Sequence, residues 1–234
     1  AVVSSPDATA VVESPPSAVF QAGAAPATPT RPGFEQGLDG WNVNEYGGSF
    51  DGRGTVAPGS VNADSAVLHE GDSFLVTLQR TITIPESPVA IEFTYIASFD
   101  TADPDFVNDA FEAALTDADG YSLVDTFTAQ RDAYFNLTEE VPAALGSGTA
   151  QIAVSEGHRS TLDISNVPLD SAATLTFRLV NNDSDTETAV TILSVDILSQ
   201  STPPTVTIGL LNDTAPDGPG SEPFRTDLLT NDPT

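Results

Sequence analysis

Aspartate and asparagine side chains gather in two stretches of the sequence, and their types and spacing suit the binding of a hard cation. The stretch NNDSDTET at 181–188 places Asp183 and Asp185 two residues apart, the spacing of alternate ligands in calcium-binding loops. The stretch FDTADPDFVND at 99–109 adds four aspartates: Asp100, Asp103, Asp105 and Asp109. If the two stretches meet at one end of the fold, they predict a shared Ca2+ site. The alternative is that 181–188 is an ordinary polar turn, because Asn and Asp favour turns.

No motif in the sequence indicates catalysis. The chain has 34 acidic residues, so carboxylate pairs of the kind that glycosidases use arise throughout by composition alone. The two histidines, His69 and His158, belong to no HExxH sequence, and no nucleophile elbow is present. Because the chain lacks cysteine, it has no thiolate nucleophile and no thiolate metal ligand. We therefore predict a non-catalytic protein.

Aromatic rings are the second feature that suits binding, because an exposed ring can stack on the flat face of a sugar. Tyr121 is one candidate, and RDAYFNLTEE at 131–140 places Arg131 and Asp132 close to Tyr134. These residues predict a ligand-binding cluster. The alternative is a strand or loop that buries Phe135. Trp41, the single tryptophan, follows a Gly-rich turn at the start of a strand, so we expect it in the core.

The net charge of the chain limits the classes of partner that it can bind and the locations that suit it. The formal net charge is -27, which repels nucleic acid and anionic membranes and suits divalent cations or a salty exterior. No apolar run reaches the about 18 residues that a spanning helix needs, so membrane insertion is not expected. The acidic composition favours the mature part of a secreted protein, and the alternative is an acidic cytoplasmic protein. We predict an extracellular location, at a cell surface or in a matrix.

Short apolar runs with strict alternation supply the strands that must position these residues. ATLTFRLV at 173–180 and VAIEFTYIA at 89–97 place apolar side chains at every second position, and SFLVTLQRTITI at 73–84 places Phe74 with Val76 and Leu78 on one face. This period of two predicts half-buried antiparallel strands. About ten such runs, separated by Gly, Asn, Asp and Pro turns, predict an all-β, antiparallel two-sheet sandwich or jelly roll.

Composition divides the chain into three segments. Residues 1–32 are rich in Pro, Ala and Ser and predict an extended arm, residues 33–199 form the sandwich domain, and residues 200–234 are a Pro/Gly/Asp-rich linker or the start of a following repeat. The arm contains two β-prone islands, so we expect residues near Val11 to Ala22 to form at least one β ladder. Its partner is either this chain or another copy of it.

Several motifs, in order, resemble the galactose-binding-like jelly rolls that include many carbohydrate-binding modules. GFEQGLDGWNV at 33–43 resembles the opening strand of that family, and AVLHEGDSFLVTLQRTITIP at 66–85 the strand pair that follows. DAFEAALTDADGYSLV at 109–124 resembles the central strand and hairpin, and TFRLVNNDSDTETAVTILSVDIL at 176–198 the closing strands. FRTDLLTNDPT at 224–234 looks like the start of an immunoglobulin-like or cadherin-like repeat, as in large secreted bacterial surface proteins.

The resemblance implies a calcium ion that ties the first strand of the domain to the last. Carried over by motif, its ligands are Glu35 and Asp196, and Asp72 or Asp51 supplies a further carboxylate. Ca2+ needs six to eight oxygens, so backbone carbonyls must complete the set. The alternative is that Glu35 and Asp196 are solvated residues at strand ends.

Two classes of function remain open at this point. The resemblance implies a calcium-stabilised extracellular module that binds a polysaccharide or glycan, or serves adhesion. The alternative is a structural subunit of an extracellular filament or surface layer, in which the Pro-rich arm of one copy adds a strand to the sheet of another. Fold alone does not decide between them, because one fold hosts many functions.

Overall fold

The structure is a computed structural model that describes residues 28–59, 64–100, 107–183 and 185–200. Within these ranges it consists of strands joined by turns and loops, and no helix is long and apolar enough to cross a membrane. The seven-stranded sheet contains, from one edge to the other, β10 (Thr149–Val154), β11 (Gly157–Asp163), β6 (Pro88–Ser98), β13 (Ala189–Ser199), β4 (Ala66–Gly71) and β3 (Arg53–Pro58), and β1 (Thr28–Thr30) also pairs with β13. The six-stranded sheet contains β2 (Asn42–Tyr46), β5 (Leu75–Thr83), β12 (Ala172–Val180), β7 (Ala110–Thr116), β8 (Ala133–Thr138) and β9 (Ala144–Leu145).

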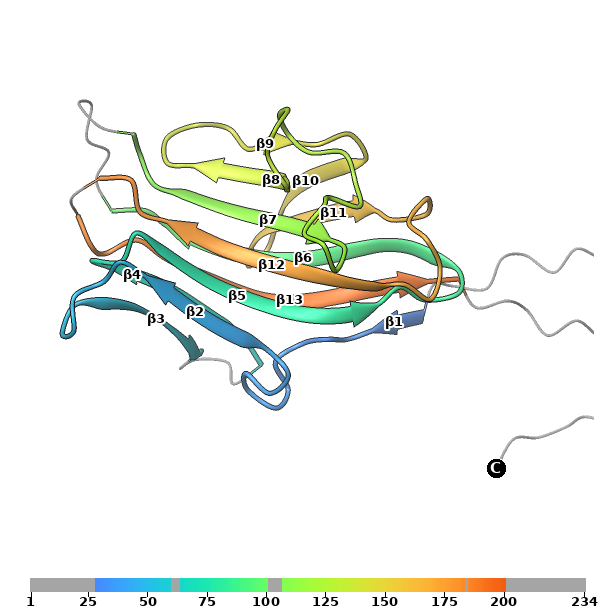
Figure 1. The fold of residues 1–234 in the computed structure, drawn as a ribbon, viewed down its shortest axis with the longest axis horizontal. Helices are drawn as coiled ribbons and strands as arrows, with labels where there is room; N and C mark the ends of the chain where they lie inside the picture. The colour runs from blue at the N-terminus through green and yellow to red at the C-terminus, as the bar shows by residue number, and fades with distance from the viewer. Residues whose placement is uncertain (1–27, 60–63, 101–106, 184, 201–234) are drawn as a thin grey trace, which may run out of the picture. The chain divides into compact units, whose positions relative to one another are not determined.

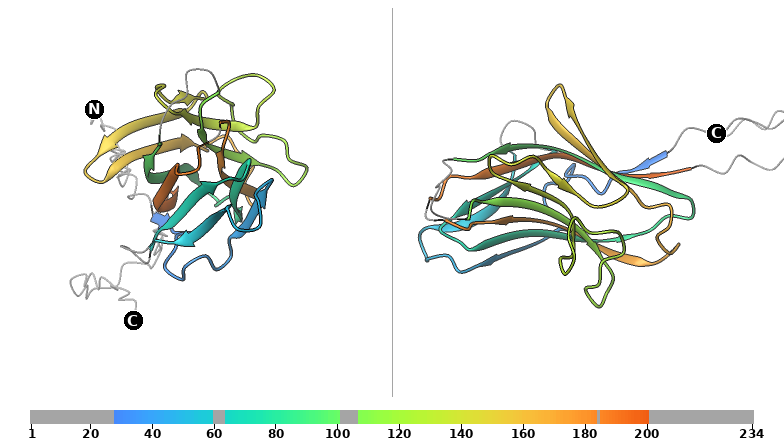
Figure 2. Two further views of the ribbon diagram at one scale, coloured as in Figure 1. Left: turned by 90° about the vertical axis from the view of Figure 1, so that its left-hand side faces the viewer. Right: turned by 90° about the horizontal axis from the view of Figure 1, so that it is seen from above.

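The strand order is that of a jelly roll. Strands β4, β5, β6 and β7 pair antiparallel with β13, β12, β11 and β8 respectively, so the first half of the domain lies along the second half as one long double strand. Rolling this double strand gives the order β4-β13-β6-β11 in one sheet and β5-β12-β7-β8 in the other, the eight-stranded pattern of two Greek keys. The two sheets form separate layers (Figures 1 and 2). The prediction of an all-β two-sheet sandwich is confirmed.

Alternation along each strand builds the core between the sheets. In β12 the four apolar residues expected on one face are all buried: Ala173, Leu175, Phe177 and Leu179. Phe93 of β6 packs against Phe177 with ring centroids 5.1 Å apart, and against Phe135 at 5.4 Å. Trp41 is also buried, with its ring 5.2 Å from that of Phe34, so its expected place in the core is confirmed.

One residue departs from the predicted core face. Phe74 was expected to share a buried face with Val76 and Leu78, but β5 begins at Leu75 and the Phe74 side chain is exposed. The turn at Gly71–Ser73 precedes it, and a backbone bond from Asn181 N–H to the Phe74 carbonyl (3.1 Å) holds it beside the loop that follows β12. The buried face therefore starts at Val76, two residues later than the sequence pattern suggested.

The end of the expected N-terminal arm takes part in the domain. Thr28, Pro29 and Thr30 pair antiparallel with Ser199, Leu198 and Ile197. β1 therefore extends the seven-stranded sheet along the last strand, beyond the stretch of β13 that β4 covers (Figure 1). The ladder expected for Val11 to Ala22, and the linker or repeat expected for 200–234, lie outside the described residues.

Candidate functional site

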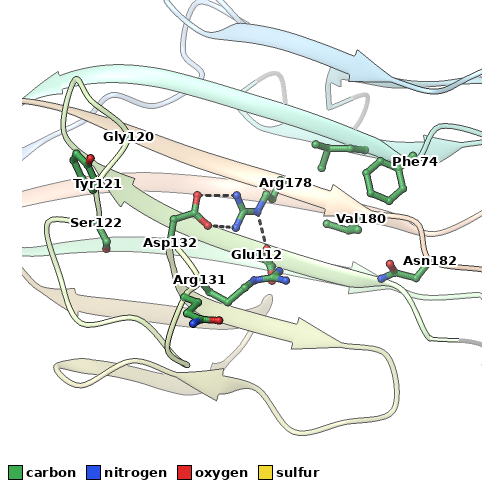
Figure 3. A pocket seen from close by; sticks show the side chains of 12 residues that line it. Phe74, Glu112, Gly120, Tyr121, Ser122, Arg131, Asp132, Arg178, Val180 and Asn182 are labelled. Atoms are coloured by element: carbon green, nitrogen blue, oxygen red, sulfur yellow. Dashed lines mark hydrogen bonds and ion pairs between the residues drawn. The ribbon is translucent and has the colours of Figure 1, made fainter.

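A groove of about 590 Å³ lies on the outer face of the six-stranded sheet. Its floor is formed by β12 and β7, and one wall by the hairpin that joins β7 to β8, residues 117–132. Figure 3 shows an arginine–carboxylate network in the middle of the groove, with Tyr121 on one side of it and Phe74 on the other. The groove therefore combines a polar centre with aromatic flanks.

The network in the floor is built around Glu112, whose side chain is fully buried. Glu112 Oε2 accepts a hydrogen bond from Arg178 Nε (2.6 Å), and Oε1 accepts from Asn136 Nδ2 (2.9 Å) and from Arg131 Nη2. Arg178 also donates from Nη1 and Nη2 to the two oxygens of Asp132 (2.9 and 2.5 Å). The two arginines and two carboxylates are thus mutually satisfied, and the floor is rigid and neutral.

Strand register brings these residues together. Arg178 of β12 and Asn136 of β8 are the direct cross-strand partners of Glu112 on the two neighbouring strands. Because successive side chains of a strand point to opposite faces, Glu112 and Arg178 lie on the outer face while Phe111 and Phe177 fill the core. The network therefore follows from the same alternation that builds the sandwich.

The paired charges stabilise each other's ionised forms. The bidentate bond from Arg178 lowers the pKa of Asp132 below its usual value, against the opposing effect of burial. Burial acts to lower the pKa of Arg178, but Asp132 and Glu112 outweigh it and raise that pKa. Arg131 and Asp132 keep exposed side-chain fractions of 49% and 40%. They can therefore still donate to and accept from a ligand.

The hairpin after β7 presents Tyr121 at the groove. Asp117 Oδ1 accepts hydrogen bonds from the N–H groups of Asp119 and Tyr121, each at 2.9 Å, and Gly120 takes the positive φ of 84° that this turn requires. The Tyr121 side chain is left 73% exposed. At the other end of the hairpin Gln130, which also lines the groove, has a left-handed φ of 66°. Such strain in a residue other than glycine is typical of sites that must hold a fixed shape.

Phe74 forms the opposite flank, with 61% of its surface exposed. Gly47, at a φ of 89°, packs beneath it, because an added Cβ there would lie 3.2 Å from Phe74 Cβ. A loop glycine and the backbone bond from Asn181 thus fix the position of an apolar ring that faces solvent. Large rings held open to water are a frequent feature of binding surfaces.

The predicted ligand-binding residues divide into two groups. Arg131 and Tyr121 line the groove together, at the two ends of the hairpin formed by residues 117–132. Tyr134 is fully buried, so its prediction as an exposed ring is wrong. It lies on β8 with Ala133 and Phe135, which are also buried, and the part of the groove that was expected from it is supplied by Asp132.

A second group of polar residues gathers at one end of the sandwich. Glu70 comes from the end of β4, Asp100 from just after β6, Asp109 from just before β7, and Asp185 from the loop between β12 and β13. One carboxylate oxygen of each lies within 4.8 Å of the others. We call these four residues the acidic cluster. The two stretches singled out in the sequence, 99–109 and 181–188, therefore do meet, through Asp100, Asp109 and Asp185.

Burial and mutual repulsion shift Glu70, Asp185 and Glu139 toward protonation, whereas the pKa of Asp100 is lowered, because its burial is outweighed by hydrogen bonds from Thr188 and Glu187. Burial raises the pKa of Glu70 to about 9, and the adjacent Asp109 adds to the shift. Burial and the neighbouring Asp183 and Asp100 raise the pKa of Asp185 to about 7. The pKa of Glu139 is raised by burial and by Asp100 and Asp109, so a fifth acidic residue shares this environment.

The remaining predicted metal ligands lie apart from the acidic cluster or beside it. Asp183 lines the same surface hollow as Asp185, and the exposed Asp72 lies at its rim, where it accepts a bond from Ser49 N–H (3.0 Å). Glu35 is exposed, and Asp196 is paired with Arg31 at 3.0 Å. Among the described residues, neither belongs to a group of three or more possible metal ligands, and an arginine already offsets the charge of Asp196. Asp103 and Asp105 lie outside the described residues.

Sequence reasoning missed Glu112, Arg178 and Glu70 as site residues. In AVLHEG at 66–71, Glu70 continues the alternate positions of Ala66 and Leu68, which are buried. An acidic residue on the core face of a strand was therefore a readable signal. The sequence signal for Glu112 and Arg178 was weaker, because their pairing depends on which strands are neighbours in the sheet.

Comparisons with known proteins give similarities of structure only. No protein-family model and no curated protein matches the sequence. The chain is similar to the enzymatically active domain of bacteriophage CBA120 tailspike protein 4 (TM-score 0.37, 13% identity), over 72% of this chain and 20% of that one. It thus spans a fifth of that tailspike structure. It is also similar to a xylan-binding domain from CBM22 (TM-score 0.36, 11% identity, 73% and 94% of the two chains). A carbohydrate-binding module that recognises mannan, from CBM27, gives a TM-score of 0.37 at 10% identity, over 77% and 100% of the chains.

Proposed function

We propose that the protein is a non-catalytic extracellular module that binds a glycan chain in the groove of its six-stranded sheet. The observation that carries this proposal is the arrangement of two exposed rings, Tyr121 and Phe74, on either side of a neutral arginine–carboxylate network (Figure 3). Sugars carry both hydroxyl groups and flat C–H faces. A groove with a polar centre and apolar flanks can bind both kinds of surface.

The polar centre suits hydroxyl recognition because its groups are already held in place. Arg131 uses one guanidinium nitrogen on Glu112, which leaves further N–H groups to donate, and half of its side chain is exposed. The oxygens of Asp132 are fixed by Arg178 and retain lone pairs for sugar hydroxyl donors. Preorganisation of this kind favours binding, because less side-chain freedom is lost when the ligand arrives.

The charge of the groove indicates neutral glycans in preference to acidic ones. Glu112 and Asp132 offset Arg131 and Arg178, so the floor offers no unpaired cation to a uronate or a sulfate. The remainder of the chain is strongly acidic, with a formal net charge of -27, and repels polyanions. We therefore infer that neutral hexose and pentose oligosaccharides are the ligand class.

Calorimetric titration of the full chain with neutral and acidic oligosaccharides tests the proposal. Tyr121→Ala and Phe74→Ala should each weaken binding of a neutral ligand by roughly tenfold, since aromatic contacts contribute about 1 kcal/mol or more. Both side chains are exposed, so the melting temperature should change little. Ile152→Ala is the control, because Ile152 is an exposed apolar residue of β10 in the other sheet. Unchanged binding in both ring variants, or tighter binding of acidic chains, contradicts the proposal.

The domain organisation belongs to the same proposal. We infer a sandwich module at 33–199 within a surface or matrix protein that serves adhesion, with an arm at 1–32 and a linker or further repeat from 200. Calcium stabilisation is part of this expectation. The alternative of a filament subunit requires strand exchange by 11–22. Light scattering of the full chain and of a chain that begins at Thr28 separates the two, because only a filament subunit loses assembly in the shorter chain.

A further inference from the structure

Unpartnered carboxylate oxygens are concentrated around the acidic cluster. Among the described residues, nine buried side-chain oxygens or nitrogens accept or donate no hydrogen bond, and five of them belong to acidic residues at this end of the sandwich: Glu70 Oε2, Asp109 Oδ2, Glu139 Oε2, Asp183 Oδ2 and Asp185 Oδ1. Glu70 and Asp109 are fully buried, and Glu139 is only 4% exposed. Buried polar atoms without partners are rare in folded proteins, so five in one place indicate that something else binds there.

The carboxylates are held in fixed orientations by the backbone. Glu70 Oε1 accepts from Thr188 N–H (2.8 Å), Asp109 Oδ1 from Asn182 N–H (2.9 Å) and Asp183 Oδ1 from Asp185 N–H (3.2 Å). In each of these three residues the second oxygen is the unpartnered one. One oxygen therefore fixes the side chain and the other remains available for a ligand.

The chain supplies no positive side chain to this region within the described residues. Its arginines interact elsewhere: Arg31 with Asp196, Arg131 and Arg178 with Glu112, Arg159 with Glu92, Arg53 with the Phe50 ring and Arg80 with the Trp41 ring. The chain contains no lysine. Buried carboxylates without a partner are costly unless they are protonated or bind a cation.

We propose that the acidic cluster binds a calcium ion that fastens the two sheets at this end of the domain. Its four members come from β4 and the loop after β6 in one sheet, from the residue just before β7 in the other, and from the loop that crosses between the sheets. Asp183 and Glu139 each have one unpartnered carboxylate oxygen and interact electrostatically with members of the cluster, so they are candidates for further ligands. The proposal goes beyond glycan binding and does not depend on it.

Calcium fits this cluster better than magnesium or protons do. Ca2+ takes six to eight oxygens at about 2.3–2.6 Å in flexible geometry, so opposite ligands lie about 5 Å apart. The cluster offers oxygens within 4.8 Å of one another from side chains set by four separate segments. Mg2+ requires near-ideal octahedral geometry and keeps several waters, which so many crowded carboxylates do not favour. Protons neutralise the residues singly but do not connect the segments.

A path from solvent leads to the site. A hollow of about 420 Å³ is lined by Asp183 and Asp185 together with Asp72, Asn181 and Phe74. Phe74 and Asn182 line both this hollow and the glycan groove, and Asn182 N–H is bonded to Asp109. An ion held here therefore also fixes the loop that forms one end of the groove.

Thermal melting of the full chain in chelator and in calcium, at constant ionic strength, tests the site. Calcium at about a hundredfold excess over its Kd should raise the melting temperature by roughly 5–10 °C. Asp109→Asn and Asp185→Asn should abolish this rise and still fold in chelator, because each removes a charge that neighbouring carboxylates repel. Asp196→Asn is the matched control at the other end of the domain, and it should keep the full rise. Calorimetric titration with Ca2+ alone should give binding in the wild type and in Asp196→Asn only.

Three results would overturn the proposal. The first is an identical melting curve in chelator and calcium for the wild type, with no heat of calcium binding. The second is a rise that survives in Asp109→Asn and Asp185→Asn but is lost in Asp196→Asn, which moves the site to the β1–β13 end. The third is an equal rise with the same concentration of Mg2+, which contradicts the assignment to calcium.

Discussion

Glu70 and Glu112 are both fully buried, but their carboxylates have different hydrogen-bond partners. Glu112 accepts hydrogen bonds from two arginines and an asparagine, so its ionised form is satisfied by side chains. Glu70 has one backbone N–H as its donor, and burial, together with Asp109 and Asp100, raises its pKa to about 9. A buried glutamate therefore has side-chain donors for both oxygens in the floor of the groove. In the acidic cluster it has one backbone donor and one unpartnered oxygen.

Replacing Glu112 measures how much the floor of the groove stabilises the fold. Removing one partner from a buried ion pair costs about 3–5 kcal/mol. We expect Glu112→Gln to lie near the lower end, about 3 kcal/mol, because Arg178 keeps its bidentate bond to Asp132. Urea unfolding measures this loss. Glu92→Gln is the control, since Glu92 is partly exposed and 4.0 Å from Arg159, and it should lose less than about 1 kcal/mol. Equal losses in the two variants would contradict the assigned role.

Asp132 should contribute to the acid sensitivity of the fold. Arg178 lowers the folded-state pKa of Asp132, so the folded protein binds this proton less readily than the unfolded chain does. The resulting stability is fully present above the unfolded pKa of about 3.9 and is lost as the pH falls through the lower folded value. The urea midpoints of wild type and Asp132→Asn should therefore differ most above about pH 5 and converge below about pH 4. If the difference between the two urea midpoints stayed constant from above about pH 5 to below about pH 4, the pair with Arg178 would not be the cause of the lowered Asp132 pKa.

At the scale of elements, alternation of apolar residues predicted most of the sandwich and little of the site. ATLTFRLV became β12 with its predicted face buried, because period two needs no knowledge of neighbouring strands. The groove depends on register: Glu112 meets Arg178 only because β7 and β12 are adjacent and aligned. Phe74 and Tyr134 were misplaced for a related reason. Phe74 lies just before β5 begins, so the pattern that buries Val76 and Leu78 does not extend to it. Tyr134 lies at a register shift between β7 and β8, where Ala133, Tyr134 and Phe135 are all buried.

The short strand β1 should stabilise the domain modestly. Its three residues pair with 197–199 of β13, and Arg31 next to it is ion-paired with Asp196. Net hydrogen bonds contribute about 0.5–1.5 kcal/mol each, and the largely exposed ion pair adds little. A chain that begins at Pro32 should therefore unfold with about 1–3 kcal/mol less free energy than one that begins at Thr28. Equal unfolding free energies of the two chains in urea would show that the β1 ladder does not stabilise the domain.

At the scale of the whole molecule, charge is distributed unevenly. The sequence has seven arginines against 34 acidic residues, and two of the arginines are used in one groove. The acidic cluster at the end of the sandwich has none among the described residues. Carboxylates elsewhere repel one another across the surface with few local cations to offset them. The ionic strength of the solution and its divalent ions must therefore contribute to the stability of the protein.

Monovalent salt should raise the melting temperature even when calcium is absent. At a net charge of -27 the folded state suffers self-repulsion that the expanded unfolded chain partly relieves. The Debye length falls from about 30 Å at 0.01 M to about 8 Å at 0.15 M, so added salt screens repulsion between distant surface charges. Salt also weakens surface ion pairs, but seven arginines allow few of these, so the screening of repulsion should dominate. Calorimetry in chelator should show a rise of several degrees between these concentrations, equal in NaCl and KCl. A fall in the melting temperature would show that attractive pairs outweigh repulsion despite the composition, and a rise in only one salt would indicate a specific monovalent site in place of screening.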